Sequence, residues 1–340
     1  MHIHRGTSRS NIAIVGGESL LGKEVRELLE ASNFGASVTL IASDESADTS
    51  VITRGREEPL VMSSLEASDV AAAKAIVLAG SAASSRKVYQ QIRGAARAPV
   101  LIDLTGALED RPDTRLRAPM LEPPDFRAAS AIQAIAHPAA IALGLFLIQL
   151  QKSARISRSV IHIFEPASER GHAGIDELQK QTVSLLSFKP LQKDVYDEQV
   201  SFNMLAQYGS DSPHSLAAIE LKIDRHLASL LAGAGAVPMP SLRLIHAPVF
   251  HGYSMSLWVE FEANADLETI EQGLASSQID VRGKEHEPPT NVGVAGQSGI
   301  TVGAIAPDRN QPRACWFWMV ADNLRIAAGN AAEVAREVVK

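Results

Sequence analysis

The sequence has almost no cysteine and few aromatic residues. Its 340 residues include a single cysteine, Cys315, and only 5% are Phe, Trp or Tyr. One thiol can form neither an intrachain disulfide nor a zinc site of several thiolates, so the hydrophobic core must hold the fold. With 46% hydrophobic residues and a length that suggests about two domains of roughly 150 residues each, such a core is available. The cysteine count is typical of the reducing cytoplasm, and we expect a cytoplasmic location.

Long apolar runs and an excess of positive charge are also missing. The longest apolar stretch, residues 139–150, is about half of the roughly 20 residues that a membrane helix needs. Lys and Arg number 32 against 39 Asp and Glu, which gives a net charge of −7. Proteins that bind nucleic acid or anionic membranes usually carry a basic surface. We therefore expect neither a membrane nor a nucleic acid as a partner.

The first third of the chain alternates short apolar runs with helical patterns. Each apolar run ends in glycine or in small polar residues. Strands of this kind, separated by helices, are typical of a parallel sheet that is covered on both faces. The predicted strands are residues 11–15, 38–42, 75–79 and 100–104, with helices near 20–29 and 84–92. Residues 109–124, rich in Pro and Arg, are predicted to form an irregular connection.

The second half of the chain has a different pattern. After a predicted buried helix at 141–150, the strands alternate more between polar and apolar residues, which is typical of antiparallel pairing. The predicted strands are residues 159–164, 242–250, 254–262 and 315–320, with helices near 175–187, 215–231 and 323–339. The predicted fold class is therefore α/β, with an N-terminal parallel sheet and a second α+β domain that contains a mixed sheet.

A glycine-rich turn joins the first predicted strand to the first predicted helix. It reads Gly16-Gly17-Glu18-Ser19-Leu20-Leu21-Gly22. At this place glycine allows a tight turn and the close approach of a pyrophosphate, which the helix N-terminus attracts through its N–H groups and dipole. Ser19 stands where a glycine would allow the closest approach, and Glu18 adds an unfavourable negative charge unless its side chain points away. The turn predicts a dinucleotide site, and its alternative is a strand-to-helix turn that binds nothing.

Acidic residues after the second predicted strand favour NAD over NADP. Asp44 and Glu45 lie about 20 residues beyond the glycine-rich turn, where a carboxylate can accept hydrogen bonds from a ribose diol. A 2′-phosphate would meet two carboxylates and no arginine at this place. The alternative is a solvated acidic turn without a ligand.

Seven segments, in the right order along the chain, resemble motifs of the aspartate-semialdehyde dehydrogenase family. The most specific is residues 318–331 (WMVADNLRIAAGNA). The others are residues 15–22 (VGGESLLG), 41–47 (IASDESA), 101–107 (LIDLTGA), 136–141 (AHPAAI), 168–178 (SERGHAGIDEL) and 247–254 (APVFHGYS). The chain is thus similar to this family along nearly its whole length.

The resemblance implies a domain organisation, an assembly and a reaction. It implies a Rossmann-type dinucleotide-binding domain at residues 1–136, to which a C-terminal helix at 322–340 returns, and a dimerisation and substrate domain at 137–321. It also implies a homodimer that reductively dephosphorylates aspartyl phosphate through a thioester, with hydride from a nicotinamide. We expect the cofactor, NAD rather than NADP, to bind at Gly16, Gly17, Ser19, Leu20, Leu21, Gly22, Asp44, Gly80 and Asn323.

Most residues that the resemblance assigns to the reaction are replaced. Ala140 stands at the position of the cysteine nucleophile, and a methyl group cannot form a thioester. Glu165 replaces a glutamine, His246 an arginine that binds the substrate carboxylate, and Tyr253 the proton-transferring histidine. Residues 168–171 (SERG) add bulk and charge where the family has a glycine-rich turn. Losing a covalent nucleophile alone costs on the order of 10⁶ in rate, so we expect the family reaction to be absent.

Three interpretations follow from these replacements. The first is a non-catalytic homologue that still binds NAD. The second is an NAD(P)-dependent oxidoreductase that acts on a semialdehyde or other carbonyl without a covalent intermediate, with Tyr253 or His137 as acid. The third is a structural subunit that pairs with an active paralogue.

Several histidines and carboxylates could take over the lost chemistry. If the fold is kept, a group of side chains converges and could hold a metal ion or carry out acid–base chemistry: His137, Glu165, His246, His251 and Tyr253. We favour a decayed pocket without a metal, because no H-x-x-x-H or similar ligand spacing occurs. His162, in a predicted strand, and His172, in a predicted turn, are expected to be structural. Glu220 and Lys222 are expected on a solvated helix face.

Overall fold

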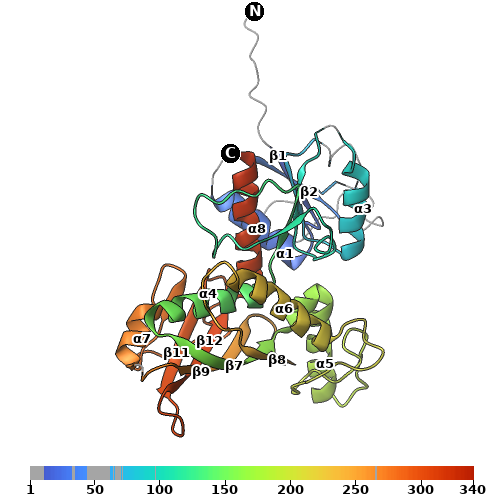
Figure 1. The fold of residues 1–340 in the computed structure, drawn as a ribbon. Helices are drawn as coiled ribbons and strands as arrows, with labels where there is room; N and C mark the ends of the chain where they lie inside the picture. The colour runs from blue at the N-terminus through green and yellow to red at the C-terminus, as the bar shows by residue number, and fades with distance from the viewer. Residues whose placement is uncertain are drawn as a thin grey trace, which may run out of the picture. The chain divides into compact units, whose positions relative to one another are not determined.

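The computed structural model describes residues 11–32, 35–43, 62–63, 65, 70, 72–95, 97–264 and 266–340. These residues form two compact units (Figure 1). The first comprises the described residues up to Ala136 together with Ala327–Lys340, and the second comprises His137–Ile326.

The first unit contains a six-stranded sheet in which all paired strands are parallel. Its order is β2-β1-β3-β4-β6-β5. Helix α3 (Ala82–Ile92) covers one face, and α1 (Leu20–Ala31) and the end of α8 (Asn323–Val339) lie on the other (Figure 1). The strands are β1 (Asn11–Val15), β2 (Ser37–Ile41), β3 (Ala75–Leu78), β4 (Val100–Asp103), β5 (Thr114–Arg117) and β6 (Ile132–Ile135). The central strands are buried on both faces, which confirms the predicted Rossmann-type sheet.

The second unit contains a mixed six-stranded sheet of order β10-β11-β12-β9-β7-β8. Helices α4 (Pro138–Ser153), α6 (Leu216–Leu231) and α7 (Leu267–Leu274) pack against it, and α5 (Gly171–Leu186) follows the short helix η1 (Ala167–Arg170). The strands are β7 (Ile156–Glu165), β8 (Ser241–His246), β9 (Tyr253–Phe261), β10 (Ile279–Val281), β11 (Ile300–Pro307) and β12 (Ala314–Ala321). The predicted α+β character of this half is confirmed.

Three local predictions are wrong. Residues 109–124 contain strand β5, whose Arg117 is buried in ion pairs that a hydropathy pattern does not reveal. Strand β8 lies parallel to β7 and not antiparallel. The prediction was wrong because alternation of polar and apolar residues indicates which face of a strand is solvated, and does not indicate the direction of the strand. His172 lies in the first turn of α5 and not in a turn between elements.

Among the described residues, no helix is long and apolar enough to cross a membrane. The longest apolar stretch of the sequence lies in α4, which is 16 residues long and largely buried within the second unit.

A buried arginine joins the end of the C-terminal helix to the edge of the first sheet. Arg117, on β5, is fully buried. Its Nε donates to the Glu122 carboxylate at 2.9 and 3.0 Å, and its Nη2 lies 2.8 Å from an oxygen of Glu337 on α8. It also donates to the amide oxygen of Gln133. Because a buried guanidinium needs a partner for each donor, α8 and this strand edge depend on each other.

We expect Arg117→Ala to lower the free energy of unfolding by about 3–5 kcal/mol, since it leaves two largely buried carboxylates without their cation. Arg127→Ala is the matched control, because Arg127 is exposed and lies 3.8 Å from Glu337. Its effect should stay below about 1 kcal/mol. Urea unfolding followed by circular dichroism measures both variants, and equal effects would contradict the proposed role of Arg117.

Candidate functional site

The glycine-rich turn lies where the strand order of the first sheet reverses. Strand β2 lies on one side of β1 and β3 on the other, and ligands of open parallel sheets bind at such points. Gly16 has φ +87°, and a Cβ there would lie 2.3 Å from Cα of Gly80, which follows β3. A Cβ on Gly22 would lie 2.1 Å from the Gly16 carbonyl oxygen. The N–H groups of Gly16 and Gly17 donate to the Ile41 carbonyl at 2.8 and 3.3 Å. Only glycine fits this close contact between turn, helix and strand.

Ser19 caps helix α1. Its hydroxyl accepts a hydrogen bond from the Gly22 N–H at 2.9 Å and donates to the Ala79 carbonyl at 2.8 Å. Leu20 and Leu21 form the start of the helix, where the first N–H groups have no acceptor within the helix. The helix N-terminus can therefore still attract an anion, although Ser19 takes up one of its N–H groups.

The Glu18 side chain reaches the end of β2. One carboxylate oxygen accepts a hydrogen bond from the Ser43 N–H at 3.0 Å and another from the Ser43 hydroxyl. The second oxygen is buried and has no hydrogen-bond partner among the described residues. Asp44 and Glu45 lie outside the described residues. Glu18 is therefore the carboxylate that the structure places at the end of the second strand.

In the second unit, Ala140, which the resemblance places at the nucleophile position, lies in the first turn of α4. Pro138 begins this helix, and the His137 ring caps it by accepting a hydrogen bond from the Ala139 N–H at 3.3 Å. Ala140 is fully buried. It presents a methyl group at a helix N-terminus, a place that would stabilise a thiolate.

Glu165 and His246 lie side by side because β7 and β8 pair in parallel and end together. Both residues are fully buried. The Tyr208 hydroxyl donates to one Glu165 oxygen at 2.8 Å and lies 3.2 Å from Nδ1 of His246. The other Glu165 oxygen pairs with the guanidinium of Arg170. Both carboxylate oxygens of Glu165 are thus held by groups of the chain itself.

Burial and the charges of the Glu165–Arg170 pair shift the pKa values of neighbouring side chains. Burial, followed by the positive charge of Arg170, lowers the pKa of His246 to about 4, so the ring is neutral at pH 7. Its Nε2 atom has no hydrogen-bond partner in the described part of the chain. Burial and the Glu165 carboxylate raise the pKa of Tyr208 above its ordinary value, which keeps this hydroxyl protonated.

Glu169 lies close to this charge pair. Asn323 donates to one of its oxygens at 2.7 Å, and Nε2 of His137 lies 3.7 Å from the other. Burial and repulsion by Glu165 raise the pKa of Glu169 to about 7, although the positive charge of Arg170 opposes this shift. Glu169 is therefore divided between its protonated and ionised forms at neutral pH.

Tyr253, at the start of β9, is fully buried. It lies close enough to Glu169 for the two groups to shift each other's pKa, and burial together with Glu169 raises the pKa of Tyr253 well above its ordinary value. The hydroxyl is therefore protonated at neutral pH.

Four of the five side chains expected to converge do lie in one network, linked through Glu169, Arg170 and Tyr208: His137, Glu165, His246 and Tyr253. His251 is exposed, and its carbonyl accepts a hydrogen bond from Asn291. Asn323, which we expect at the cofactor, bonds to Glu169 and to the Gly252 N–H within the second unit. The part of the chain that the structure describes contains no group of three or more His, Cys, Asp or Glu side chains that could hold a metal ion.

Tyr208 was not predicted from the sequence. It lies between α5 and α6, outside helices and strands, so no periodic pattern marks it. The rarity of tyrosine in this sequence is the one signal that could have drawn attention to Tyr208. The chain has four tyrosines, and three of them, Tyr196, Tyr208 and Tyr253, are buried in the second unit.

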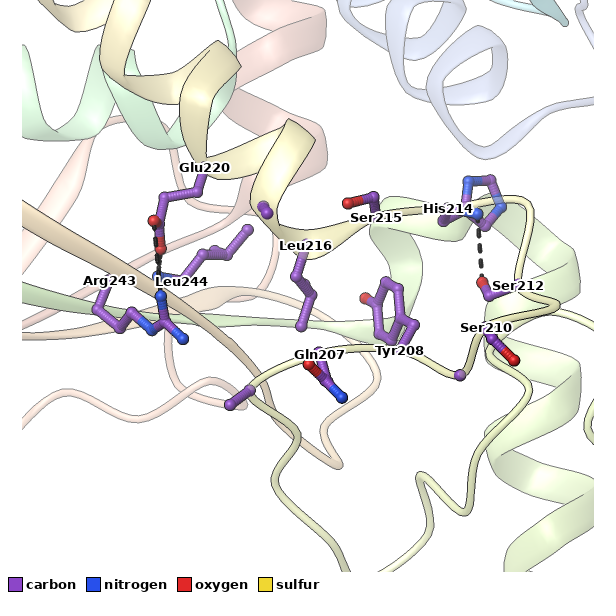
Figure 2. Close-up of a pocket in the computed structure, with 13 residues that line it drawn as sticks. Gln207, Tyr208, Ser210, Ser212, His214, Ser215, Leu216, Glu220, Arg243 and Leu244 are labelled. Carbon is purple, nitrogen blue, oxygen red and sulfur yellow. Dashed lines mark hydrogen bonds and ion pairs between the residues drawn. The ribbon is translucent and has the colours of Figure 1, made fainter.

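A cavity of about 410 Å³ lies next to Tyr208 (Figure 2). Glu220, on α6, lines it, accepts a hydrogen bond from the Leu244 N–H at 2.6 Å and lies 3.9 Å from the Arg243 guanidinium. Glu220 is therefore not on a solvated face, because this side of α6 packs against β8. Other polar residues of the lining are Gln207, Ser210, Ser212, His214 and Ser215.

The raised pKa of Glu169, from 4.5 to about 7, predicts a pH dependence of stability. Between these values the folded chain keeps a proton that the unfolded chain has lost, so the free energy of unfolding should fall as the pH rises. The contribution is at most about 3 kcal/mol. Urea titrations at several pH values between about 5 and 7 give the free energy of unfolding as a function of pH. In Glu169→Gln the decrease of this free energy with rising pH should lose the part that Glu169 contributes. Glu262→Gln, a control at an exposed position, should show the same pH dependence as the wild type. An unchanged slope in Glu169→Gln would contradict the assignment.

Two protein-family models match the chain, one over most of the first unit and one over most of the second. Residues 11–163 match the family described as "Semialdehyde dehydrogenase, NAD binding domain", and residues 147–326 match "Semialdehyde dehydrogenase, dimerisation domain". A USG-1 protein homolog of Azotobacter vinelandii is 29% identical over 97% of this chain and 98% of its own length. The aspartate-semialdehyde dehydrogenase of Rickettsia bellii is 26% identical over 98% of this chain and 99% of its own.

A solved structure resembles the whole chain. It is that of a probable aspartate-semialdehyde dehydrogenase from Pseudomonas aeruginosa, with a TM-score of 0.82, 28% identity and coverage of 98% of this chain and 99% of its own. The dimerisation-domain match alone spans more than half of the sequence. The chain belongs to the semialdehyde dehydrogenase family, as its resemblance to aspartate-semialdehyde dehydrogenases predicts.

Proposed function

We propose that this chain is a homodimeric, cytoplasmic member of the family that binds NAD but does not carry out the thioester reaction. The first unit acts as the dinucleotide-binding domain and the second as the dimerisation and former substrate domain. The observation that carries the proposal is the buried methyl group of Ala140 at the N-terminus of α4. Without a thiolate at this place the acyl-enzyme intermediate cannot form.

The single cysteine of the chain does not replace the missing nucleophile. Cys315 lies at the start of β12, opposite Val259 of β9, and is buried. Burial, followed by the negative charge of Asp308, raises the pKa of its thiol. A protonated thiol inside a sheet is a packing residue and not a nucleophile.

The binding of a substrate carboxylate is impaired in a second way. The position that the resemblance assigns to the binding arginine holds His246, which is neutral at pH 7. Arg170 brings a guanidinium into the same network, but Glu165 already holds it. A substrate carboxylate would have to displace a buried partner, which costs several kcal/mol.

Proton transfer is affected as well. The family's histidine position holds Tyr253, whose burial keeps the hydroxyl protonated. A phenol with a raised pKa cannot accept a proton at neutral pH. The nucleophile, the carboxylate-binding group and the base are thus all missing from one constellation.

A second candidate function is direct hydride transfer between NAD(P) and a carbonyl. The observation in its favour is that Glu169, whose pKa is about 7, lies next to the buried Tyr253 hydroxyl. The protonated Glu169 carboxyl could donate a proton to a carbonyl oxygen at neutral pH. We rank this function second because the Glu165–Arg170 pair occupies the same network.

NAD is preferred over NADP in this proposal. The close contact between Gly16 and Gly80 lies where the strand order of the sheet reverses, a place that fits a pyrophosphate. Glu18 supplies a carboxylate at the end of β2. An acidic group at this place suits an unmodified ribose and repels a 2′-phosphate. Asp44 and Glu45, which follow in the sequence, add further negative charge.

Homodimer formation is supported by an apolar row on the second sheet. Val160, Trp258 and Trp316 lie opposite one another on three neighbouring strands. Val160 is 40% and Trp316 41% exposed. Both indole N–H groups donate to Asp308, at 2.9 and 2.8 Å. We assign this row to the dimer interface because interface centres are enriched in tryptophan.

We expect turnover of aspartate semialdehyde with phosphate and NAD or NADP to stay below about 1 s⁻¹ in the wild type. Ala140→Cys should not restore it, since losses within one catalytic group are strongly non-additive. Ala142→Cys, equally buried on α4, controls for the added thiol. The steady-state rate of the wild type and of both variants is measured from the absorbance of the reduced nicotinamide. Ordinary dehydrogenase rates in the wild type or in Ala140→Cys would refute the proposal.

Trp316→Asp should weaken the homodimer by at least about 30-fold, because an interface tryptophan contributes about 2 kcal/mol or more. Phe188→Asp is the control, since Phe188 is 98% exposed and lies outside the row. Light scattering after size exclusion, over a range of concentrations, gives the dissociation constant of each variant. A wild-type monomer, or equal dimers in both variants, would contradict this assignment.

A further inference from the structure

We propose that Glu18 selects the dinucleotide in this chain. Its carboxylate accepts a hydrogen bond from a hydroxyl of the adenosine ribose and excludes a 2′-phosphate. This inference rests on the dinucleotide binding proposed above. It assigns to a residue of the glycine-rich turn a role that usually belongs to an acidic residue after the second strand.

The position of the carboxylate is the first argument. Val15 and Ile41 end β1 and β2 in matched register, so the turn after β1 and Ser43 after β2 lie at the same sheet edge. Glu18 spans from this turn to Ser43. The negative charge therefore lies at the end of the second strand, where open parallel sheets recognise a ribose.

The donors that Glu18 occupies are the second argument. The Ser43 N–H and hydroxyl are donors at the end of β2 that could hold a 2′-phosphate, and both donate to one Glu18 oxygen. A 2′-phosphate would lose these donors and face a carboxylate. Like charges brought together in a binding site are strongly disfavoured.

The free oxygen of Glu18 is the third argument. It is buried and has no hydrogen-bond partner among the described residues. A buried carboxylate oxygen gains from a donor, and a ribose hydroxyl is a donor of the right kind. A ribose hydroxyl that reaches this oxygen would supply the missing donor while the other oxygen stays bound to Ser43.

The packing of the turn does not explain this side chain. Gly16 and Gly22 of this turn are required by backbone contacts of 2.3 and 2.1 Å that a Cβ would make. Glu18 contacts Ser43 through its carboxylate, at the end of its own flexible side chain. A shorter neutral residue would leave the turn intact and set the Ser43 donors free.

Isothermal titration of the full chain with NAD and with NADP tests the inference. We expect the wild type to bind NAD, and to bind NADP at least about 100-fold more weakly than NAD. In Glu18→Gln, which keeps the shape and removes the charge, this preference should fall at least about tenfold through a gain in NADP affinity. In Glu18→Ala, NAD affinity should fall about tenfold, because the ribose acceptor is lost.

Glu30→Gln is the matched control, since it removes the same charge from an exposed position near the end of α1. Thermal unfolding of each variant checks the fold independently of binding. An NAD/NADP preference unchanged in Glu18→Gln, with NAD still bound, overturns the inference and leaves the proposed function in place. Binding of neither dinucleotide by the wild type overturns both. Binding that then appears in Glu18→Ala would identify Glu18 as a block and not a ribose acceptor.

Discussion

The ion pair between Glu165 and Arg170 determines the chemistry of the second unit. Both charges are removed from water, so each is stable only next to the other, and breaking the pair would leave an uncompensated buried charge. Its neighbours follow from it. Arg170 helps to keep His246 neutral, and the Tyr208 hydroxyl is oriented toward the second Glu165 oxygen. The negative charge of Glu165 helps to push the pKa of Glu169 to about 7. These residues form a polar cluster in which Glu165 and Arg170 are paired with each other within the chain.

Glu165 and Arg170, both of which the resemblance marks as departures from the family motifs, depend on each other physically. A glutamate at position 165 would be a buried unpaired charge without Arg170, and Arg170 would be one without Glu165. Gly171, which follows Arg170, has φ +62° with open space where a Cβ would lie, so this position favours glycine because of its backbone conformation.

How far the sequence could predict the molecule depended on the kind of force that fixes each element. β1 and α8 have the predicted bounds, Asn11–Val15 and Asn323–Val339, because apolar burial and helical periodicity are local signals. β5 was missed because Arg117 is buried by distant partners, one of them 220 positions away on α8. Tyr208 and the parallel pairing of β8 also depend on residues far apart in sequence. For the site, the resemblance identified Ala140, Glu165, His246 and Tyr253, but not that Arg170 and Tyr208 would tie two of them together.

The first unit separates what packing requires from what a ligand would require. Gly16, Gly22 and Gly80 are fixed by contacts within the fold itself, so their presence would be expected with or without a dinucleotide. Ser19 likewise has a complete structural role as the cap of α1. Glu18 is different, because one of its oxygens is buried without a donor among the residues that the structure describes. Its hydrogen bonds to Ser43 need only the other oxygen, so fold stability does not account for the second acceptor. The proposed recognition of a ribose hydroxyl would account for it.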